Sequence, residues 1–253
     1  MFSKKWIALL VSLTLLACML LGCQSKADEG EATIVWGTNA EFVPFETKDS
    51  DGSVVGVDAN IAAAIAEHIG AKLVIEDMNF DSLPAALQSG KIDMIIAGYS
   101  RNEEREETMD FSTSYYTARQ VVIVAEDTEG IASEEDLIGK TIGVQGGTTG
   151  DLFVASEIEG AEIHRYTSMT LACQDLTNGK LDCVIGDSLT ISLIQRSIKN
   201  LKIVESIIYP DEYYAIAVMK GNTDLLNQIN ETLAELQKNG SIDNWVVEFS
   251  TTD

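Results

Sequence analysis

Apolar runs of strand length alternate with apolar stripes of helical spacing along most of this chain. Runs rich in β-branched and apolar residues predict strands over 33–36, 54–57, 73–75 and 92–97. After the second run, apolar residues recur at helical spacing at Ile61, Ile65 and Ile69. Asp58 is expected to N-cap this helix and Gly70 to end it. Strands that alternate with helices indicate an α/β fold with mostly parallel sheets.

The second half of the chain repeats part of the first. Residues 86–100 (ALQSGKIDMIIAGYS) and 175–189 (DLTNGKLDCVIGDSL) share five identities at an offset of 89 residues. Two earlier strand segments, ATIVWGTN at 32–39 and KTIGVQGG at 140–147, also resemble each other. Corners of the helix–Gly–strand type look alike in many α/β proteins, but the matching order of elements favours two related lobes.

Two lobes of this kind would place a cleft between their strand ends. Ligands of open α/β sheets bind beyond the carboxyl ends of the strands. Those ends are predicted at 98–100 in the first lobe and at 186–188 in the second. A strand over 214–218 and a long amphipathic helix over 224–238 follow, and we expect this tail to rejoin the first lobe.

The first 23 residues have the features of a secretory signal. Two lysines at 4–5 precede an uncharged apolar run over 6–21, shorter than the roughly 20 residues that span a bilayer. The motif LLGC, which ends at Cys23, resembles the bacterial lipobox. We therefore predict a lipoprotein signal peptide at 1–22, lipidation of Cys23 and a flexible tether at 23–32. Ordinary signal cleavage with a free cysteine is the alternative.

The composition excludes several classes of function. The chain has 253 residues, with 40 Asp+Glu against 17 Lys+Arg and a formal net charge of −23. Nucleic-acid binding needs clustered Lys and Arg, which this chain lacks. A charged fraction of 23% and a single long apolar run exclude a multi-pass membrane protein. Because the chain has 2 His and 4 Cys, we expect no His/Cys metal centre and no cofactor.

Three motifs allow more than one interpretation. The segment TKDSDG at 47–52 followed by Asp58 has part of the acid spacing of a calcium loop, but a hairpin turn explains it without a metal. Cys173 and Cys183 occupy apolar periodic positions, compatible with a disulfide or with buried free thiols. The glycine-rich segment 146–150 lacks the Lys of a phosphate-binding loop.

Charged residues near the predicted strand ends suit a zwitterion. Asn102 is expected to N-cap a helix that holds Arg105 in its first turn, where guanidinium and helix N-terminus both favour a carboxylate. The turn 146–150 offers backbone N–H groups to the same anion. Asp187 is a lone acid at the second strand end. One cation site and one anion site would match the two charges of an α-amino acid.

Four segments, in order along the chain, resemble one protein family. They are NAEFVPFETKDSDGSVVGVDANIAAAIAEHIGAKL at 39–73, FDSLPAALQSGKIDMIIAGYS at 80–100, ERxxxxDFSxxYY at 104–116 and GKTIGVQGGTTG at 139–150. Over residues 33–250 the chain resembles the extracytoplasmic solute-binding proteins of polar amino acid ABC importers, in their lipoprotein form. The resemblance implies a two-lobed periplasmic-binding-protein-like (type II) fold, in which two α/β lobes are joined by two crossing segments. We place these crossings near 119–122 and 210–214.

The resemblance also implies a role for each matching residue. Arg105 matches the residue that binds the ligand α-carboxylate, and its partners are the backbone N–H groups of Ser100, Thr148 and Thr149. The residues that match the α-ammonium site are Asp187, Gly98 through its carbonyl and Ser100 through its hydroxyl. The aromatic residues placed against the ligand side chain are Phe42 and Phe80, and the weaker candidates for its polar end are Asn39 and Gln145.

The implied organisation is lobe 1 over 33–119, lobe 2 over 120–210 and a return to lobe 1 over 211–253. We expect a non-enzymatic monomer, anchored to the outer face of the cell membrane, that closes around a polar or basic L-amino acid and delivers it to an ABC permease. The alternatives are a secreted dehydratase-like enzyme on the same fold and an amino-acid-sensing surface protein. Open questions are the amino acid, the permease, and whether Tyr99 and Glu41 face the pocket.

Overall fold

A computed structural model describes residues 32–251. The predicted signal peptide, Cys23 and the tether up to residue 31 lie outside the described residues. Across residues 32–251, none of the helices combines the length and the apolar character that crossing a bilayer requires.

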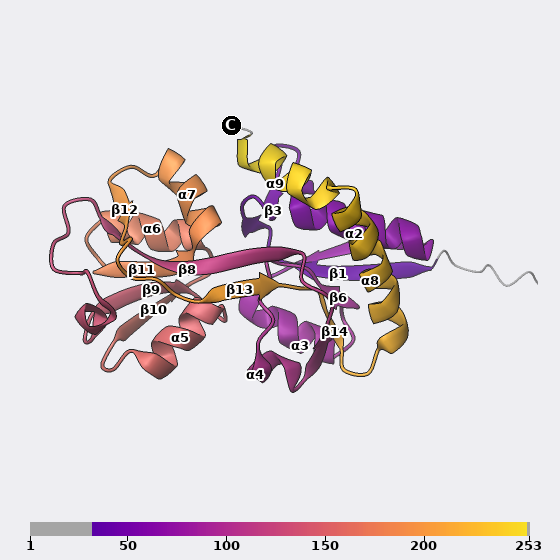
Figure 1. Ribbon diagram of the computed structural model, residues 1–253, viewed down its shortest axis with the longest axis horizontal. Helices are drawn as coiled ribbons and strands as arrows, with labels where there is room; N and C mark the ends of the chain where they lie inside the picture. The colour runs from indigo at the N-terminus through magenta and orange to yellow at the C-terminus, as the bar shows by residue number, and fades with distance from the viewer. Residues whose placement is uncertain (1–31, 252–253) are drawn as a thin grey trace, which may run out of the picture. The chain divides into compact units, whose positions relative to one another are not determined.

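The first sheet combines N-terminal strands with a strand from the C-terminal tail (Figure 1). In spatial order, its strands are β5 (Lys72–Asp77), β1 (Thr33–Thr38), β6 (Met94–Ile95), β14 (Ala217–Met219) and β7 (Met109–Phe111). Strand β1 is parallel to β5 and β6, whereas β14 is antiparallel to β6 and β7. A smaller antiparallel sheet consists of β2 (Glu41–Phe42), β3 (Glu46–Lys48) and β4 (Val54–Val55).

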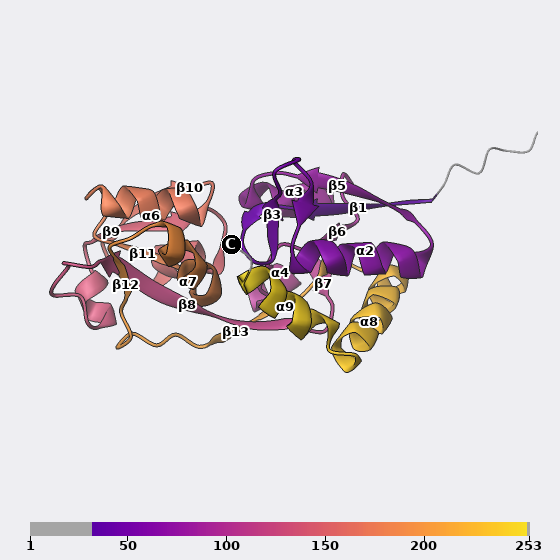
Figure 2. The ribbon, with the colours of Figure 1, turned by 90° about the horizontal axis from the view of Figure 1, so that it is seen from above.

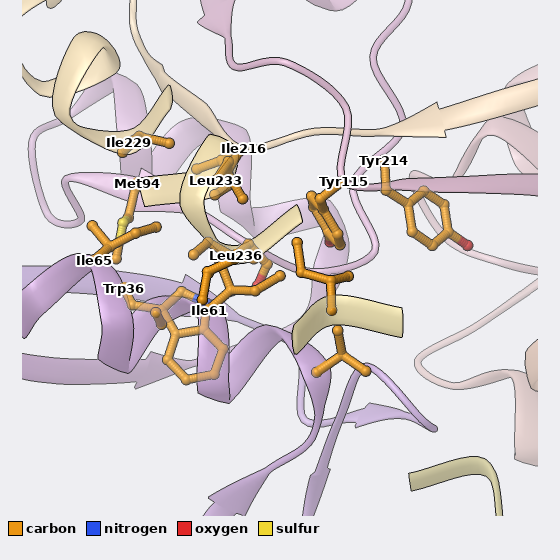
Figure 3. Close-up of a cluster of buried hydrophobic side chains, with 14 of the residues drawn as sticks. Trp36, Ile61, Ile65, Met94, Tyr115, Tyr214, Ile216, Ile229, Leu233 and Leu236 are labelled. Carbon is orange, nitrogen blue, oxygen red and sulfur yellow. The ribbon is translucent and has the colours of Figure 1, made fainter. Parts of the chain in front are cut away.

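Four helices of this lobe contribute apolar side chains to cores that they share with the first sheet. They are α2 (Val57–Ile69), α3 (Leu83–Gln88), α8 (Thr223–Lys238) and α9 (Ser241–Thr251), with a short 3₁₀ turn, η1 (Phe80–Ser82). Figure 3 shows Ile61 and Ile65 of α2 packed with Ile229 and Leu233 of α8 over Trp36 of β1, all fully buried. Each such side chain contributes roughly 1.5–3 kcal/mol on burial. This shared core therefore attaches the tail to the first sheet.

The start of α2 differs from the prediction. The helix begins at Val57 and its N-cap is Gly56, so Asp58 lies inside the first turn and is fully buried. Gly56 has φ 132°, and a Cβ atom there would lie 2.2 Å from the carbonyl oxygen of Phe45. Only glycine fits this close approach, which starts the helix two residues earlier than predicted and places Asp58 in its buried first turn. The predicted end is confirmed, because Gly70 adopts the left-handed C-cap conformation.

The second sheet belongs to the middle of the chain. In spatial order, its strands are β10 (Glu162–Tyr166), β9 (Thr141–Gln145), β11 (Cys183–Asp187), β8 (Tyr116–Ala125) and β12 (Leu201–Ile203), and β13 (Asp211–Tyr214) also pairs with β8. The helices of this lobe are α5 (Thr149–Glu157), α6 (Met169–Thr177) and α7 (Ser188–Ser197), with a 3₁₀ turn, η2 (Glu134–Leu137). Cys173 and Cys183 are buried here as free thiols, which resolves the two alternatives.

Two antiparallel strands cross from one sheet to the other, as Figures 1 and 2 show. The start of β8 pairs with β13, in a register that places Tyr116 opposite Tyr214 and Arg119 opposite Asp211. The rest of β8 pairs with β11 and β12. The predicted strand over 214–218 is accordingly broken, because β13 stays with β8 and β14 joins the first sheet. The two-lobed α/β fold is thus confirmed.

The repeated segments form the same corner in both lobes. Asp93 accepts a hydrogen bond from Val35 N at 2.7 Å, and Asp182 accepts one from Thr141 N at 2.8 Å. The preceding glycines, Gly90 and Gly179, share φ 72°. These contacts make Val35 and Thr141 equivalent positions of the two resembling strand segments.

The segment 47–52, which has part of the acid spacing of a calcium loop, forms a hairpin turn. Strands β3 and β4 pair on either side of it, and Asp49 N donates to Ser53 O at 2.9 Å. Among the described residues, no cluster of three or more His, Cys, Asp or Glu side chains could hold a metal ion.

Candidate functional site

A pocket lies where the sequence predicted a cleft, at strand ends of both lobes. The predicted residues that line it are Phe42, Phe80, Gly98, Ser100, Arg105, Gln145, Thr148, Thr149 and Asp187. The exception is Asn39, which lies behind Gln145 and accepts a hydrogen bond from its Nε2 atom at 2.8 Å. The structure thus brings together residues that are up to 145 positions apart in the sequence.

Arg105 is fixed by hydrogen bonds at both its backbone and its side chain. It lies in α4 (Glu103–Glu106), and its backbone N–H donates to Asn102 Oδ1 at 2.8 Å, so the predicted N-cap is confirmed. Its Nη1 donates to Ser100 O at 2.6 Å and its Nη2 to Gly147 O at 2.9 Å. Because Gly147 belongs to the second lobe, this guanidinium already contacts both lobes.

Aromatic rings cover the guanidinium of Arg105 as well. Its Cζ lies 3.9 Å from the ring centroid of Tyr99 and 5.7 Å from that of Phe80. Tyr99 is fully buried behind Arg105 and stacks on Phe111, so it packs away from the pocket. Arg105 is only 7% exposed, and its removal from water lowers its pKa, a shift that Tyr99 and Glu212 oppose. A cation this desolvated is well placed to bind an anion.

Asp187 is the corresponding acid of the second lobe. It ends β11 and N-caps α7, where its Oδ1 accepts from Leu189 N at 3.3 Å. Its Oδ2 accepts a hydrogen bond from the Tyr214 hydroxyl. Asp187 is 3% exposed, and burial raises its pKa to about 7; the Tyr214 bond opposes this shift and the Glu212 carboxylate adds to it. Near neutral pH, this carboxyl can exchange its proton for a cationic partner.

The start of α5 faces the pocket opposite Arg105. Thr148 is its N-cap and accepts from Asp151 N at 3.4 Å, while its own hydroxyl donates to Gln145 O at 2.8 Å. The Thr148 N–H makes a long hydrogen bond, 3.4 Å, to Gln145 O. The first N–H groups of a helix have no partner within the helix, so those at Thr149 and Gly150 are available to an anion. The glycine-rich turn thus leads directly into a helix whose first N–H groups face the pocket.

Ser100 presents its backbone to the pocket because of how it pairs with the crossing strand. It forms an isolated antiparallel bridge with Tyr214, in which Ala215 N donates to Tyr99 O and Arg101 N donates to Tyr213 O. A bridge of this type uses the groups that flank Ser100 and directs its own N–H and C=O to the other side. Its C=O accepts from Arg105, so its N–H lies on the same side.

Two phenylalanines form the apolar part of the lining. Phe80 is buried and half-buried Phe42 lies against Gly98, where a Cβ atom would come within 2.6 Å of the Phe42 ring. Gly98 also has φ 53°, so both its conformation and its space require glycine. Glu41, next to Phe42, is exposed and lies outside the lining.

Gln145 carries an unused acceptor. It is 2% exposed, and its Nε2 donates to Asn39 Oδ1 and to Thr167 O. Its Oε1 is buried and finds no donor within the described part of the chain. A buried acceptor without a partner costs about 1–3 kcal/mol, so a ligand with an N–H group would satisfy it.

Several residues of the site are not among the predicted ones. The lining also includes Ala97, Gln120, Met169, Gly186 and Tyr214. Behind them, Glu212 accepts hydrogen bonds from two of the predicted residues, the hydroxyls of Ser100 and Thr149. The alternation of side chains along 211–214 could have indicated that Glu212 and Tyr214 share one face of a crossing strand.

The fold and the site together define a solute-binding protein with a cleft between two lobes. A model of the bacterial extracellular solute-binding proteins, family 3, matches residues 34–250. The chain therefore belongs to this family.

Several known proteins that are similar in sequence or structure are named as amino-acid-binding proteins. The chain is 33% identical to a probable histidine-binding protein of Neisseria gonorrhoeae, over 95% of this chain and 93% of the relative. It is 30% identical to the structure of AbpA, an amino acid ABC transporter substrate-binding protein of Streptococcus pneumoniae bound to L-arginine, with a TM-score of 0.82 over 87% and 94% of the two chains. An ancestral arginine-binding protein bound to glutamine is 38% identical, with a TM-score of 0.77 over 86% and 97%.

Proposed function

We propose that this protein binds a polar or basic L-amino acid as a zwitterion in the pocket between its lobes. The observation that carries this proposal is the pairing of Arg105 with Asp187 in one pocket. One comes from each lobe, each is more than 90% buried, and they have opposite charge. Buried charges are costly unless they are paired, and a zwitterion supplies a partner for both.

The backbone groups around the two charges extend this arrangement. We propose that the ligand α-carboxylate binds Arg105 together with the N–H groups of Ser100, Thr148 and Thr149. The ligand α-ammonium binds Asp187, with the carbonyl of Gly98 and the hydroxyl of Ser100 as further acceptors. Charge-assisted hydrogen bonds of this kind are about twice as strong as neutral ones.

The rest of the pocket favours a side chain with an apolar stem and an N–H group at its end. Phe42 and Phe80 suit the stem or a flat cationic group, and the unpaired Oε1 of Gln145 calls for a donor. Histidine, arginine and glutamine, which appear in the names of the similar proteins, all carry such a donor.

Ligand-driven closure is the mechanism that the contacts support. Hydrogen bonds connect the lobes across the cleft. Arg105 donates to Gly147 O and Gln145 Nε2 to Asn39 Oδ1. Thr190 Oγ1 donates to Val43 O at 2.8 Å. Because the two charge partners belong to different lobes, the ligand satisfies both only in the closed arrangement. Its differential affinity for that arrangement shifts the open–closed equilibrium.

The biological role follows from the family. We propose that the closed protein delivers its amino acid, chemically unchanged, to the permease of an ABC importer. The signal peptide at 1–22 would direct the chain out of the cytoplasm, and lipidation of Cys23 would anchor it to the outer face of the cell membrane. Two acyl chains suffice for stable anchoring. The segment 23–32 would tether the two lobes to this anchor. Lobe 1 would comprise residues 33–119 and 211–253, and lobe 2 residues 120–210.

A thermal-shift screen of residues 24–253 against the common L-amino acids tests this function. At 100 times Kd, a ligand stabilises the protein by about 2.7 kcal/mol, which raises the melting temperature by several degrees. We expect the largest shifts with arginine, histidine or glutamine and none with aspartate or glutamate. A melting temperature that no amino acid changes would contradict the proposal.

A further inference from the structure

Glu212 is an acid of the crossing strand β13 that lies directly behind the pocket. Its Oε2 accepts from Ser100 Oγ at 2.7 Å, from Thr149 Oγ1 at 2.7 Å and from Gln120 Nε2 at 3.5 Å. All three donors line the pocket, and they come from the first lobe, the second lobe and the crossing strand β8. One carboxylate therefore connects every part of the molecule that forms the site.

The hydrogen bonds to Glu212 also orient the hydroxyls of the lining. A hydroxyl has a single proton, and those of Ser100 and Thr149 are directed to Glu212. Their lone pairs are then left to face the pocket as acceptors. This orientation of the hydroxyls favours the ligand α-ammonium, and it does so equally for every amino acid.

The charge of Glu212 acts differently on different ligands. Among the described residues that line the pocket, only Arg105 and Asp187 are charged, and their charges cancel when both are ionised. Glu212 adds one negative charge, and its field reaches both of them. A neutral zwitterion leaves this extra charge in place, whereas an amino acid with a cationic side chain compensates it.

A second acid near the pocket, Asp58, acts in the same direction. The buried carboxylate of Asp58 accepts from Gly98 N at 2.8 Å, on the side away from the cleft. Arg119, a basic residue of β8, is by contrast paired with Asp211 at the surface. The surroundings of the site therefore retain a negative charge.

We propose that Glu212 is a specificity-determining residue, whose carboxylate selects amino acids with a positively charged side chain over neutral ones of the same shape. This inference rests on the proposed function, because it assumes that the pocket binds an amino acid. It concerns the charge of the side chain, which the pair of Arg105 and Asp187 does not distinguish.

L-arginine and L-citrulline provide the sharpest test, because they differ in charge and hardly in shape. Calorimetry should show that the wild-type protein binds arginine more tightly than citrulline by about tenfold or more, the order expected for unit charges about 10 Å apart in an effective dielectric of about 20. The substitution Glu212→Gln, which keeps the side-chain shape, should reduce this preference by about tenfold. Glu212→Asp, which keeps the charge, should retain the preference even if both ligands bind more weakly.

Asp211→Asn is the matched control. Asp211 is the neighbouring acid of the same strand and points to the other face, where its side chain is 45% exposed and paired with Arg119. This variant loses the same formal charge and should keep the wild-type ratio of the two affinities. Equal weakening of both ligands by Glu212→Gln would overturn the inference and leave Glu212 a positioning residue only.

The wild-type protein alone provides a second test that depends on no variant. If it binds citrulline as tightly as arginine, the inference is wrong while the proposed function stands. If it binds no amino acid at all, the proposed function itself fails.

Discussion

The two lobes share one structural corner and yet present opposite charges to the pocket. In both, a left-handed glycine leads into an aspartate that accepts from the backbone of the neighbouring strand: Asp93 in the first lobe and Asp182 in the second. The lobes diverge only after the strand that follows. The first continues through Ser100 into α4, which carries Arg105, whereas the second ends directly on Asp187. The repeated part holds the fold, and the segment just beyond it supplies the chemistry.

The two charges also depend on their surroundings to different degrees. Arg105 is held by carbonyl groups and aromatic rings and stays cationic at any accessible pH. Asp187 has a pKa near 7, so its charge depends on pH. The cation site is therefore permanent, whereas the anion site depends on pH.

Loss of the cation site should have the largest effect. Arg105→Ala leaves the ligand carboxylate buried without a charge partner, at a cost of about 3–5 kcal/mol. The dissociation constant should rise by roughly 10²–10³-fold or more, measured by calorimetry at pH 8. Arg101→Ala is the control, because Arg101 is 52% exposed and paired with Glu106 at the surface. Near-normal affinity of the Arg105 variant would contradict the site assignment.

The anion site should show itself in the pH dependence of binding. Below pH 7 the free protein holds a proton on Asp187, which the ligand ammonium must displace, so binding releases a proton. The affinity for L-arginine should therefore fall as the pH falls, by up to about tenfold per pH unit below about 7. Both cationic groups of arginine stay protonated between pH 5 and 8, so the change reports on the protein.

Asp187→Asn removes this titration. The variant should bind arginine about 10²-fold more weakly at pH 8, with little dependence on pH down to 5.

The stability of the free wild-type protein should change with pH in the opposite direction to its affinity for arginine. Because the folded-state pKa of Asp187 is raised, its stabilising contribution is present at low pH and is lost as the pH rises through 7. A wild-type affinity that stays constant from pH 8 to pH 5 would rule out the pH-dependent anion site.

The smallest effects should come from the corner that both lobes share. Asp93 is partly buried and Asp182 is exposed, although they make the same hydrogen bond. Asp93→Ala should lower the free energy of unfolding by about 1–2 kcal/mol, and Asp182→Ala should lower it by clearly less, because water replaces the lost bond. Urea unfolding of the two variants gives this comparison directly. Equal losses would mean that burial does not distinguish the two corners.

Much of this fold could be predicted because it depends on local patterns. The stripe at Ile61, Ile65 and Ile69, the terminal Gly70 and the run before Asp187 each specify an element through neighbours in the sequence. The repeat predicted two lobes for the same reason. The start of α2 was missed, because it depends on how Gly56 fits against Phe45, a contact between segments that no local pattern records.

The candidate site was predictable where its residues belong to a motif. Arg105 lies three positions after Asn102, the N-cap of its helix, and Thr148 with Thr149 opens a helix after a glycine-rich turn. Glu212 and Tyr214 lie on a crossing strand whose position relative to the pocket depends on the packing of both lobes. Their roles depend on hydrogen bonds with Ser100 and Asp187, which are distant in the sequence, so no local pattern predicts them.

The central claim is that the pocket binds a zwitterion through both of its charges. Calorimetric titration of the wild-type protein with L-arginine, with agmatine and with Nα-acetyl-L-arginine tests it most directly, because agmatine lacks the α-carboxylate and the acetylated compound lacks the α-ammonium. The account predicts that both derivatives bind at least about 100-fold more weakly than L-arginine. Binding of either derivative as tightly as L-arginine would contradict it.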